Sequence, residues 1–133
     1  MFDRLPIREM IMTDVNRVID GYFAIWNETA PARRRDLIAK TWAENAAYLD
    51  PIMAGEGHDG IDKMIAGAQA QFPGHVFRQI GKADNHNDRI RFSWVLVGPD
   101  GREAGIAGTD FGTVSGDGRL AAVTGFLDQM PGA

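Results

Sequence analysis

Residues 48–61 have the sequence YLDPIMAGEGHDGI, which contains the end of a strand, a loop and the start of a helix. Tyr48 and Leu49 favour the pleated, half-buried surface of a strand. Pro51 ends that strand, because it has no N–H to donate and it holds Asp50 in an extended conformation. A glycine-rich loop follows, and a helix is predicted to begin at His58 or Asp59.

Apolar residues at helical spacing predict three helices around this stretch. The first is expected from Thr13 to Asn27, with a start as early as Pro6, on the stripe Ile11, Val15, Val18, Tyr22 and Ile25. The second begins at Pro31, because proline suits the first helical position, and is expected to end near Ala46. The third carries an apolar stripe formed by Ile61, Met64, Ile65, Ala68 and Phe72.

After Gly74 the period of the apolar residues changes to two, which indicates strands. They are predicted at residues 75–82, 89–97, 103–114 and 120–126, separated by polar turns. In the last strand the alternation places Phe126 on the face that the helices cover. Three helices followed by an antiparallel meander predict one α+β domain over residues 1–133, with the helices on one face of a curved sheet. A cavity between the two layers would be a natural ligand site.

Composition and charge narrow the possible partners. The chain is 44% hydrophobic and 24% charged, with a net charge of −4 and no basic stripe, which argues against nucleic acid or an anionic membrane. No apolar run reaches membrane-spanning length, and charged residues interrupt the N-terminal region, so a cytoplasmic location is expected. The chain has no cysteine, and His58, His75 and His86 lack ligand spacing. Neither a metal nor a cofactor is expected.

Two acids and one phenol are candidates for chemistry in the predicted cavity. Asp50 lies at a strand end among apolar residues and could act as a general base, or it could simply cap the turn at Pro51. Asp110 lies inside a strand, where aspartate is rare, and it either faces the cavity or meets solvent or an arginine. Tyr22 is on the buried stripe of the first helix and needs a partner for its hydroxyl.

Several of these motifs together resemble the nuclear transport factor 2-like superfamily, and within it the SnoaL-like polyketide cyclases and ketosteroid isomerases. The resemblance extends from about Val15 to Asp128 and rests on the helix order and on three motifs, Leu49-Asp50-Pro51, Gly57 to Ile61, and Gly108-Thr109-Asp110-Phe111 with the following strand. It implies a cone-shaped α+β barrel. It also implies a homodimer that packs through its sheets. Fold alone does not determine activity, because this fold carries enzymes, binding modules and transport proteins.

Ketosteroid isomerase has a tyrosine on its first helix, a base in a strand-end Asp-Pro pair and an aspartic acid in a late strand. Tyr22, Asp50 and Asp110 match these three positions, whereas Ile65 stands where a supporting tyrosine of that family is expected. In that isomerase, a tyrosine and an aspartic acid that a raised pKa keeps protonated form the oxyanion hole. The resemblance implies that Asp50 is the base and that Tyr22 and a neutral Asp110 donate to an enolate oxygen.

Three hypotheses for function follow. The first is an enzyme that moves a proton alpha to a carbonyl of a small apolar substrate, with cavity walls formed by Trp26, Met53, Met64, Phe72, Trp94 and Phe126. The second is a non-catalytic module that binds a small apolar ligand, and the third is a protein-interaction domain. For the predicted homodimer, the exposed sheet face is expected to carry Val95, Val97, Ala121, Val123, Gly125 and Leu127.

Overall fold

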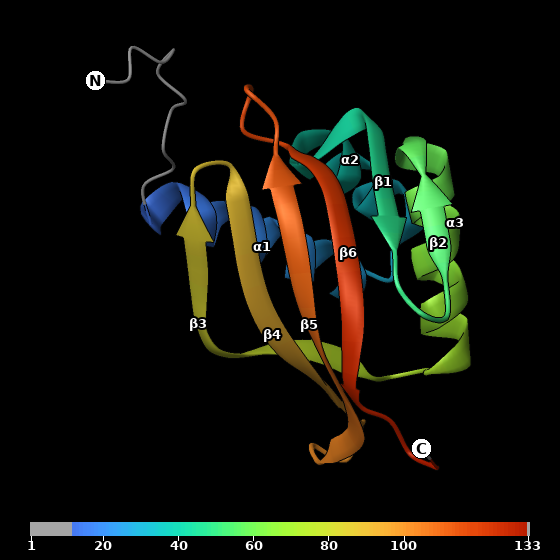
Figure 1. Cartoon of the computed structure of the whole chain (residues 1–133). Helices are drawn as coiled ribbons and strands as arrows, with labels where there is room; N and C mark the ends of the chain where they lie inside the picture. Colours follow the sequence, from blue (N-terminus) through green and yellow to red (C-terminus); the bar gives the residue numbers. More distant parts are fainter. Residues whose placement is uncertain (1–11, 133) are drawn as a thin grey trace.

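A computed structural model of the chain describes residues 12–132 and shows two layers, with helices on one face of a sheet (Figure 1). The helices are α1 (Met12–Asn27), α2 (Pro31–Thr41) and α3 (Gly57–Gln71). The strands are β1 (Trp42–Leu49), β2 (Ala54–Glu56), β3 (Val76–His86), β4 (Arg89–Val97), β5 (Glu103–Val114) and β6 (Leu120–Gln129). The predicted start near Pro6 and the stripe residue Ile11 lie outside the described residues.

The six strands form one curved sheet in the order β2-β1-β6-β5-β4-β3. All neighbours are antiparallel except β1 and β6, which run parallel. Because β2 and β3 are the two edges and do not pair with each other, the described sheet is not closed. The predicted α+β class, with three helices on a mostly antiparallel sheet, is confirmed. The parallel pair joins the first strand of the chain to the last.

The end of the second helix was predicted wrongly. α2 ends at Thr41, and the chain becomes extended at Trp42, where the second helix was expected to continue to Ala46. The cause is tertiary, because Trp42 pairs with Leu120 in β6 and is fully buried in the core. A tryptophan side chain stabilises the fold more when it packs in a buried strand than when it extends a short helix.

The direction of the side chains in β6 also differs from the sequence prediction. Ala122 pairs with Thr113 and Leu120 with Val114, so β6 has one extra residue between these pairs. An extra residue of this kind is a β-bulge, and it moves the following side chains to the opposite face. Val123 is therefore 1% exposed in the core and Leu127 faces the cavity, whereas Phe126 is 53% exposed. Phe126 was wrongly predicted to line the cavity, and Val123, Gly125 and Leu127 were wrongly predicted to lie on the outer face.

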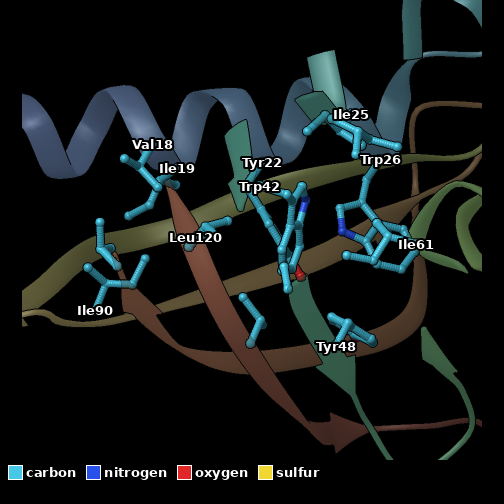
Figure 2. Close-up of a cluster of buried hydrophobic side chains, with 14 of the residues drawn as sticks. Val18, Ile19, Tyr22, Ile25, Trp26, Trp42, Tyr48, Ile61, Ile90 and Leu120 are labelled. Carbon is cyan, nitrogen blue, oxygen red and sulfur yellow. The ribbon is translucent and has the colours of Figure 1, made fainter. Parts of the chain in front are cut away.

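The main core lies between α1 and the inner face of the sheet (Figure 2). The apolar stripe of α1 packs against β1, β4 and β6, and Tyr22 contacts the rings of Trp42 and Phe92. Trp26, one turn further along α1, contacts the rings of Tyr48 and Phe77. The helix thereby places two polar aromatic side chains at the boundary between the core and the cavity.

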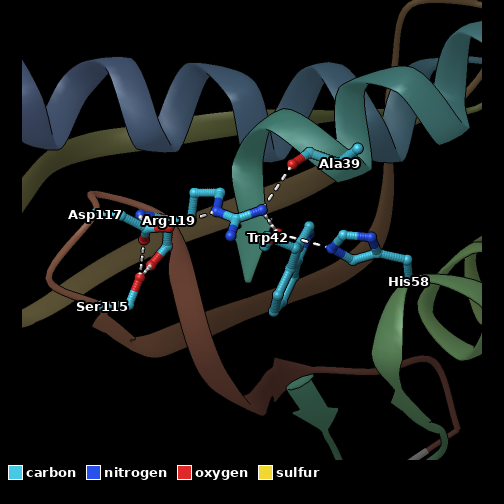
Figure 3. Close-up of polar contacts among 6 residues, drawn as sticks. All are labelled: Ala39, Trp42, His58, Ser115, Asp117 and Arg119. Atoms are coloured by element: carbon cyan, nitrogen blue, oxygen red, sulfur yellow. Dashed lines mark hydrogen bonds and ion pairs between the residues drawn. The ribbon is translucent and has the colours of Figure 1, made fainter. Parts of the chain in front are cut away.

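The junction of α2 and β1 is fixed by polar contacts to backbone carbonyls (Figure 3). The Nε2–H of His58 donates to the Trp42 carbonyl over 2.8 Å, and Arg119 donates to the carbonyls of Ala39 and Trp42. Asp117 pairs with Arg119 and accepts a hydrogen bond from Ser115. His58 therefore has a structural role here, and it does not line the cavity described below.

Candidate functional site

A partly open cavity of about 120 Å³ lies between α1, the C-terminal half of α3 and the inner face of β4, β5 and β6. Its wall is mainly aromatic and aliphatic, and its polar groups come from few side chains. Tyr22, Asp50 and Asp110 all line it, so the three residues singled out from the sequence meet in one place. Ile52, Gln71, Phe72 and Met130 are among the residues that line the rest of it.

Asp110 points into the cavity and is only 2% exposed. The Tyr22 hydroxyl donates to its Oδ2 over 2.7 Å, and the indole N–H of Trp94 donates to its Oδ1 over 3.2 Å. The indole can lie there because Gly108 is its cross-strand neighbour, where an added Cβ would be 2.5 Å from the Trp94 ring. The alternative that Asp110 meets solvent or an arginine is therefore wrong.

The pKa of Asp110 is raised to about 6, mainly by burial and in smaller part by the charges of Asp50 and Asp128. The hydrogen bonds from Tyr22 and Trp94 act in the opposite direction, because they stabilise the charged form. The raised pKa agrees in direction with the sequence prediction. However, a pKa of about 6 leaves the charged form in about tenfold excess at pH 7, so the expected neutral Asp110 is a minority there.

Asp50 forms part of the turn that follows β1. Its Oδ1 accepts hydrogen bonds from the backbone N–H groups of Ile52 and Met53, at 2.8 and 2.9 Å. Its Oδ2 accepts the hydroxyl of Tyr48 at 2.6 Å. A carboxylate has about four acceptor positions, so one is not used by these three bonds. Asp50 thus caps a turn and also lines the cavity, and the two alternatives drawn from the sequence are compatible.

The two carboxyl groups approach each other at Gly125 of β6. A Cβ added at Gly125 would lie 3.0 Å from Oδ1 of Asp110, 3.1 Å from Cβ of Asp50 and 3.1 Å from the Tyr48 hydroxyl. The strand order explains this, because β6 lies between β1 and β5 and Gly125 pairs with Asp110. The absence of a side chain at this position lets the acids and the phenol share one end of the cavity.

Tyr48 was missed as a site residue in the sequence, although a signal was present. It precedes Asp50 by two residues, and side chains two apart in a strand share a face. Burial, followed by the charge of Asp110, raises the pKa of both Tyr22 and Tyr48 above the usual range of a phenol. Both hydroxyls therefore keep their protons at neutral pH and act as donors to the two carboxyl groups.

The predicted wall residues divide into two groups. Trp26, Met53, Phe72 and Trp94 line the cavity, whereas Met64 packs against the main core and Phe126 lies on the outer face of the sheet. Sequence reasoning missed further lining residues, including Phe23, Phe77, Leu96, Ile106 and Leu127. Their shared position depends on sheet curvature, which single-sequence periodicity does not specify.

Within residues 12–132 no group of three or more histidine and acidic side chains has the arrangement of a metal site. No helix in this described part of the chain is long and apolar enough to cross a membrane. The hydrogen-bonding partners of both acids are uncharged donors, so proton transfer is the chemistry that this arrangement can perform with its own groups.

Comparison with solved structures shows the same fold in several bacterial proteins. One is a "putative isomerase of the SnoaL-like family" from Agrobacterium tumefaciens, with 44% identity, a TM-score of 0.85 and coverage of 88% of this chain and 99% of that one. A "putative SnoaL-like polyketide cyclase" from Jannaschia has 18% identity, a TM-score of 0.67 and coverage of 96% and 92%.

A protein of unknown function with a cystatin-like fold from Methylobium petroleophilum has 15% identity, a TM-score of 0.72 and coverage of 94% and 84%. No curated protein matches the chain. The model of the SnoaL-like domain matches residues 19–123, which include all three candidate residues and most of both layers. The chain therefore belongs to the SnoaL-like family.

Proposed function

We propose that this protein is an enzyme that moves a proton alpha to a carbonyl group of a small, mostly apolar substrate. The observation that carries the proposal is the convergence of Asp50 and Asp110 at one end of an apolar cavity. Two acids with different environments in one site are the usual basis of acid–base catalysis. The names of the similar isomerase and cyclase structures agree with this reaction class.

In the proposed reaction Asp50 is the base. Its open acceptor position takes a proton from the carbon beside the carbonyl, and the electron pair of that C–H bond moves toward the carbonyl oxygen. Protonated Asp110 donates a hydrogen bond to the resulting enolate oxygen. Where a carbon–carbon double bond adjoins the alpha carbon, the enolate is a dienolate, and Asp50 returns the proton to the far carbon of that double bond, which gives an isomer. In a cyclisation the enolate carbon instead attacks a second carbonyl of the same substrate, and the oxygen of that carbonyl takes the proton that Asp50 holds.

The structure changes the role of Tyr22 in this mechanism. Its hydroxyl donates to Oδ2 of Asp110, so in this proposal it acts on that carboxyl group. Asp110 is protonated in about a tenth of the molecules at pH 7, given its pKa of about 6. A bound ligand that displaces water raises this fraction, because desolvation disfavours the charged form.

The volume of the cavity limits the size of the substrate that it can enclose. An engineered cavity of about 150 Å³ holds benzene, so a cavity of about 120 Å³ suits a single ring, with any longer part leaving through the opening. Small cyclic ketones are therefore the first compounds to examine. They present an acidic C–H bond and a carbonyl oxygen without any charge.

The test is hydrogen exchange at the alpha carbon, which requires no knowledge of the final product. Small cyclic ketones are incubated with the protein in D₂O, and deuterium incorporation is followed by NMR. Asp50→Asn should lower the exchange rate at least about 100-fold, because a positioned base contributes about 10²–10⁴-fold. Asp84→Asn is the matched control, since Asp84 pairs with Arg91 on β3 and β4 outside the cavity. An unchanged rate in Asp50→Asn would refute the proposed base.

The alternative is a non-catalytic module that binds a small apolar ligand in the same cavity. The contacts of Asp50 favour this alternative to some extent, because three hydrogen bonds give the residue a structural reason to be present. Tight binding of a cyclic ketone without any exchange of its alpha hydrogens would support it.

We also propose that the outer face of the sheet packs against a second copy of this chain. Among residues 12–132, five of the six large apolar side chains that are exposed lie on this face by strand register, namely Leu49, Val76, Ile80, Phe111 and Phe126. Phe111 and Phe126 stack edge to face with ring centroids 5.7 Å apart. Such a patch is typical of an interface, and a twofold axis through it would be self-complementary. A purely protein-binding role would use this same patch.

A further inference from the structure

The two carboxylate oxygens of Asp50 have different surroundings. Oδ1 accepts the backbone N–H groups of Ile52 and Met53, and since a carboxylate oxygen has about two acceptor positions, both positions of Oδ1 are occupied. Oδ2 accepts one hydrogen bond from the described residues, that of the Tyr48 hydroxyl. The lone pair with which Asp50 takes a proton therefore belongs to Oδ2, the same oxygen that Tyr48 contacts.

The side chain of Tyr48 is fixed beside this oxygen. Tyr48 is 4% exposed and lies on β1, where its backbone pairs with Gly55 of β2 and with Val123 of β6. Its ring packs against the indole of Trp26, with ring centroids 5.6 Å apart (Figure 2). Its hydroxyl lies close to Gly125, where an added Cβ would be 3.1 Å from it. A donor that is enclosed in this way determines the position of the oxygen that it contacts.

The hydrogen bond between Tyr48 and Asp50 is of the strong, charge-assisted kind. Its length of 2.6 Å lies in the range that is typical of a hydroxyl donor and a charged acceptor. Burial, followed by the charge of Asp110, raises the pKa of Tyr48 above the usual range of a phenol, so the hydroxyl keeps the proton that it donates. Such a bond both orients Oδ2 and favours its charged form.

The other titratable groups at this end of the cavity come from different elements. Tyr22 lies on α1 and Asp110 on β5, and Asp128 of β6 acts on Asp110 through its charge. No lysine, arginine or histidine among the described residues lines the cavity. The hydroxyl of Tyr48 is therefore the side-chain donor that favours a charged Asp50 beside a second acid.

We propose that Tyr48 is the positioning residue of the base, and that its hydroxyl holds Oδ2 of Asp50 so that the remaining acceptor position of this oxygen takes the proton. The inference rests on the proposed function, because it takes Asp50 to be the base. A fixed oxygen stays aligned with the C–H bond of the substrate, and small misplacements of a reacting group lower a rate strongly. The same bond keeps Asp50 charged to lower pH.

The experiment follows exchange of the alpha hydrogens of cyclohexanone in D₂O at a series of pH values. The reaction needs a charged Asp50 and a neutral Asp110, so the rate should rise with pH as Asp50 loses its proton and fall as Asp110 does. Tyr48→Phe keeps the ring and removes the donor. Its maximal rate should fall about 10- to 100-fold. The rising limb should move to higher pH by about one to two units, which is the value of one hydrogen bond to a charged group.

Tyr22→Phe is the matched comparison, because it removes the corresponding donor from Asp110. This variant should move the falling limb to higher pH and leave the rising limb in place. In the Tyr22→Phe background Tyr48 is the only tyrosine of the chain, so 3-fluorotyrosine can be placed there alone. Its hydroxyl is a stronger donor of the same shape, so it should move the rising limb to lower pH, and it provides a second test if Tyr48→Phe fails to fold.

A purely structural role of Tyr48 would lower the rate equally at every pH. The inference is overturned by that result, by an unchanged profile in Tyr48→Phe, or by a rising limb that 3-fluorotyrosine does not move. If exchange in the unmodified protein depends on Asp50 but not on Tyr48, only this inference fails. If the unmodified protein exchanges no hydrogen at any pH, the proposed function fails and the inference fails with it.

Discussion

Replacing Tyr22 by phenylalanine should raise the pKa of Asp110. The Tyr22 hydroxyl donates to Oδ2 of Asp110 over 2.7 Å and stabilises its charged form. A hydrogen bond to a charged group is worth about 1.5–3 kcal/mol, and one pKa unit corresponds to about 1.4 kcal/mol. The loss of this bond should therefore move the pKa from about 6 to about 7–8. Asp110 would then change from mostly charged to about half or more neutral at pH 7.

The assay is a titration of the Asp110 carboxyl carbon by ¹³C NMR in the unmodified protein and in Tyr22→Phe. Tyr48→Phe is the matched control, because its hydroxyl donates to Asp50 and its loss should leave Asp110 nearly unchanged. Trp94→Phe should give a smaller rise than Tyr22→Phe, since its bond is longer at 3.2 Å. A pKa of Asp110 that stays constant or falls in Tyr22→Phe would refute the reasoning, because it would show that the phenol does not stabilise the carboxylate.

Two further predictions concern stability and assembly. Asp110 has a higher pKa in the folded chain, about 6, than its ordinary value of 3.8, so the folded state gains stability from protonation below about pH 4 and loses it as the pH rises through 6. The side chain of Asp110→Asn stays neutral, so the free energy of unfolding of this variant at pH 7 should exceed that of the unmodified protein by up to about 3 kcal/mol. Urea unfolding measures this difference, which should disappear near pH 4. Equal free energies of unfolding at pH 7 would contradict the prediction. The proposed dimer should sediment as a monomer in Phe126→Asp, whereas Ile52→Asp, which changes an exposed residue at the cavity opening, should leave it unchanged. A dimer that persists in Phe126→Asp would place the interface elsewhere.

Local signals in the sequence were sufficient for much of the fold. The bounds of β4 and β5 match the prediction, because clear alternation ends at turns rich in glycine and proline. The start of β1 could not be predicted, because it depends on the pairing of Trp42 with Leu120, which lies far away in the sequence. The bulge in β6 could not be predicted either, because it is a departure from regular alternation that appears only in the pairing with β5. The error at Phe126 follows directly, since one unrecognised extra residue inverts every later side chain in a strand.

The candidate site was predictable in its members but not in its contacts. Tyr22, Asp50 and Asp110 were identified by residue type, by position in their elements and by a family resemblance. That Tyr22 donates to Asp110 depends on the depth of α1 above β5, which no periodicity encodes. The role of Gly125 could not be predicted either, because it depends on which two strands lie beside β6 and which of their side chains approach the glycine.

The parallel pairing of β1 with β6 has a consequence for the order of folding. Asp50 follows β1 and Asp110 lies in β5, and the strand between them is β6, the last of the described strands. During synthesis the three helices, β1 and both acids leave the ribosome before the segment that joins them. Contacts across so large a sequence separation form slowly, because loop closure must come first. The two carboxyl groups are therefore brought together late in folding, and a nascent chain that lacks β6 exposes the apolar stripe of α1 until β6 has been made.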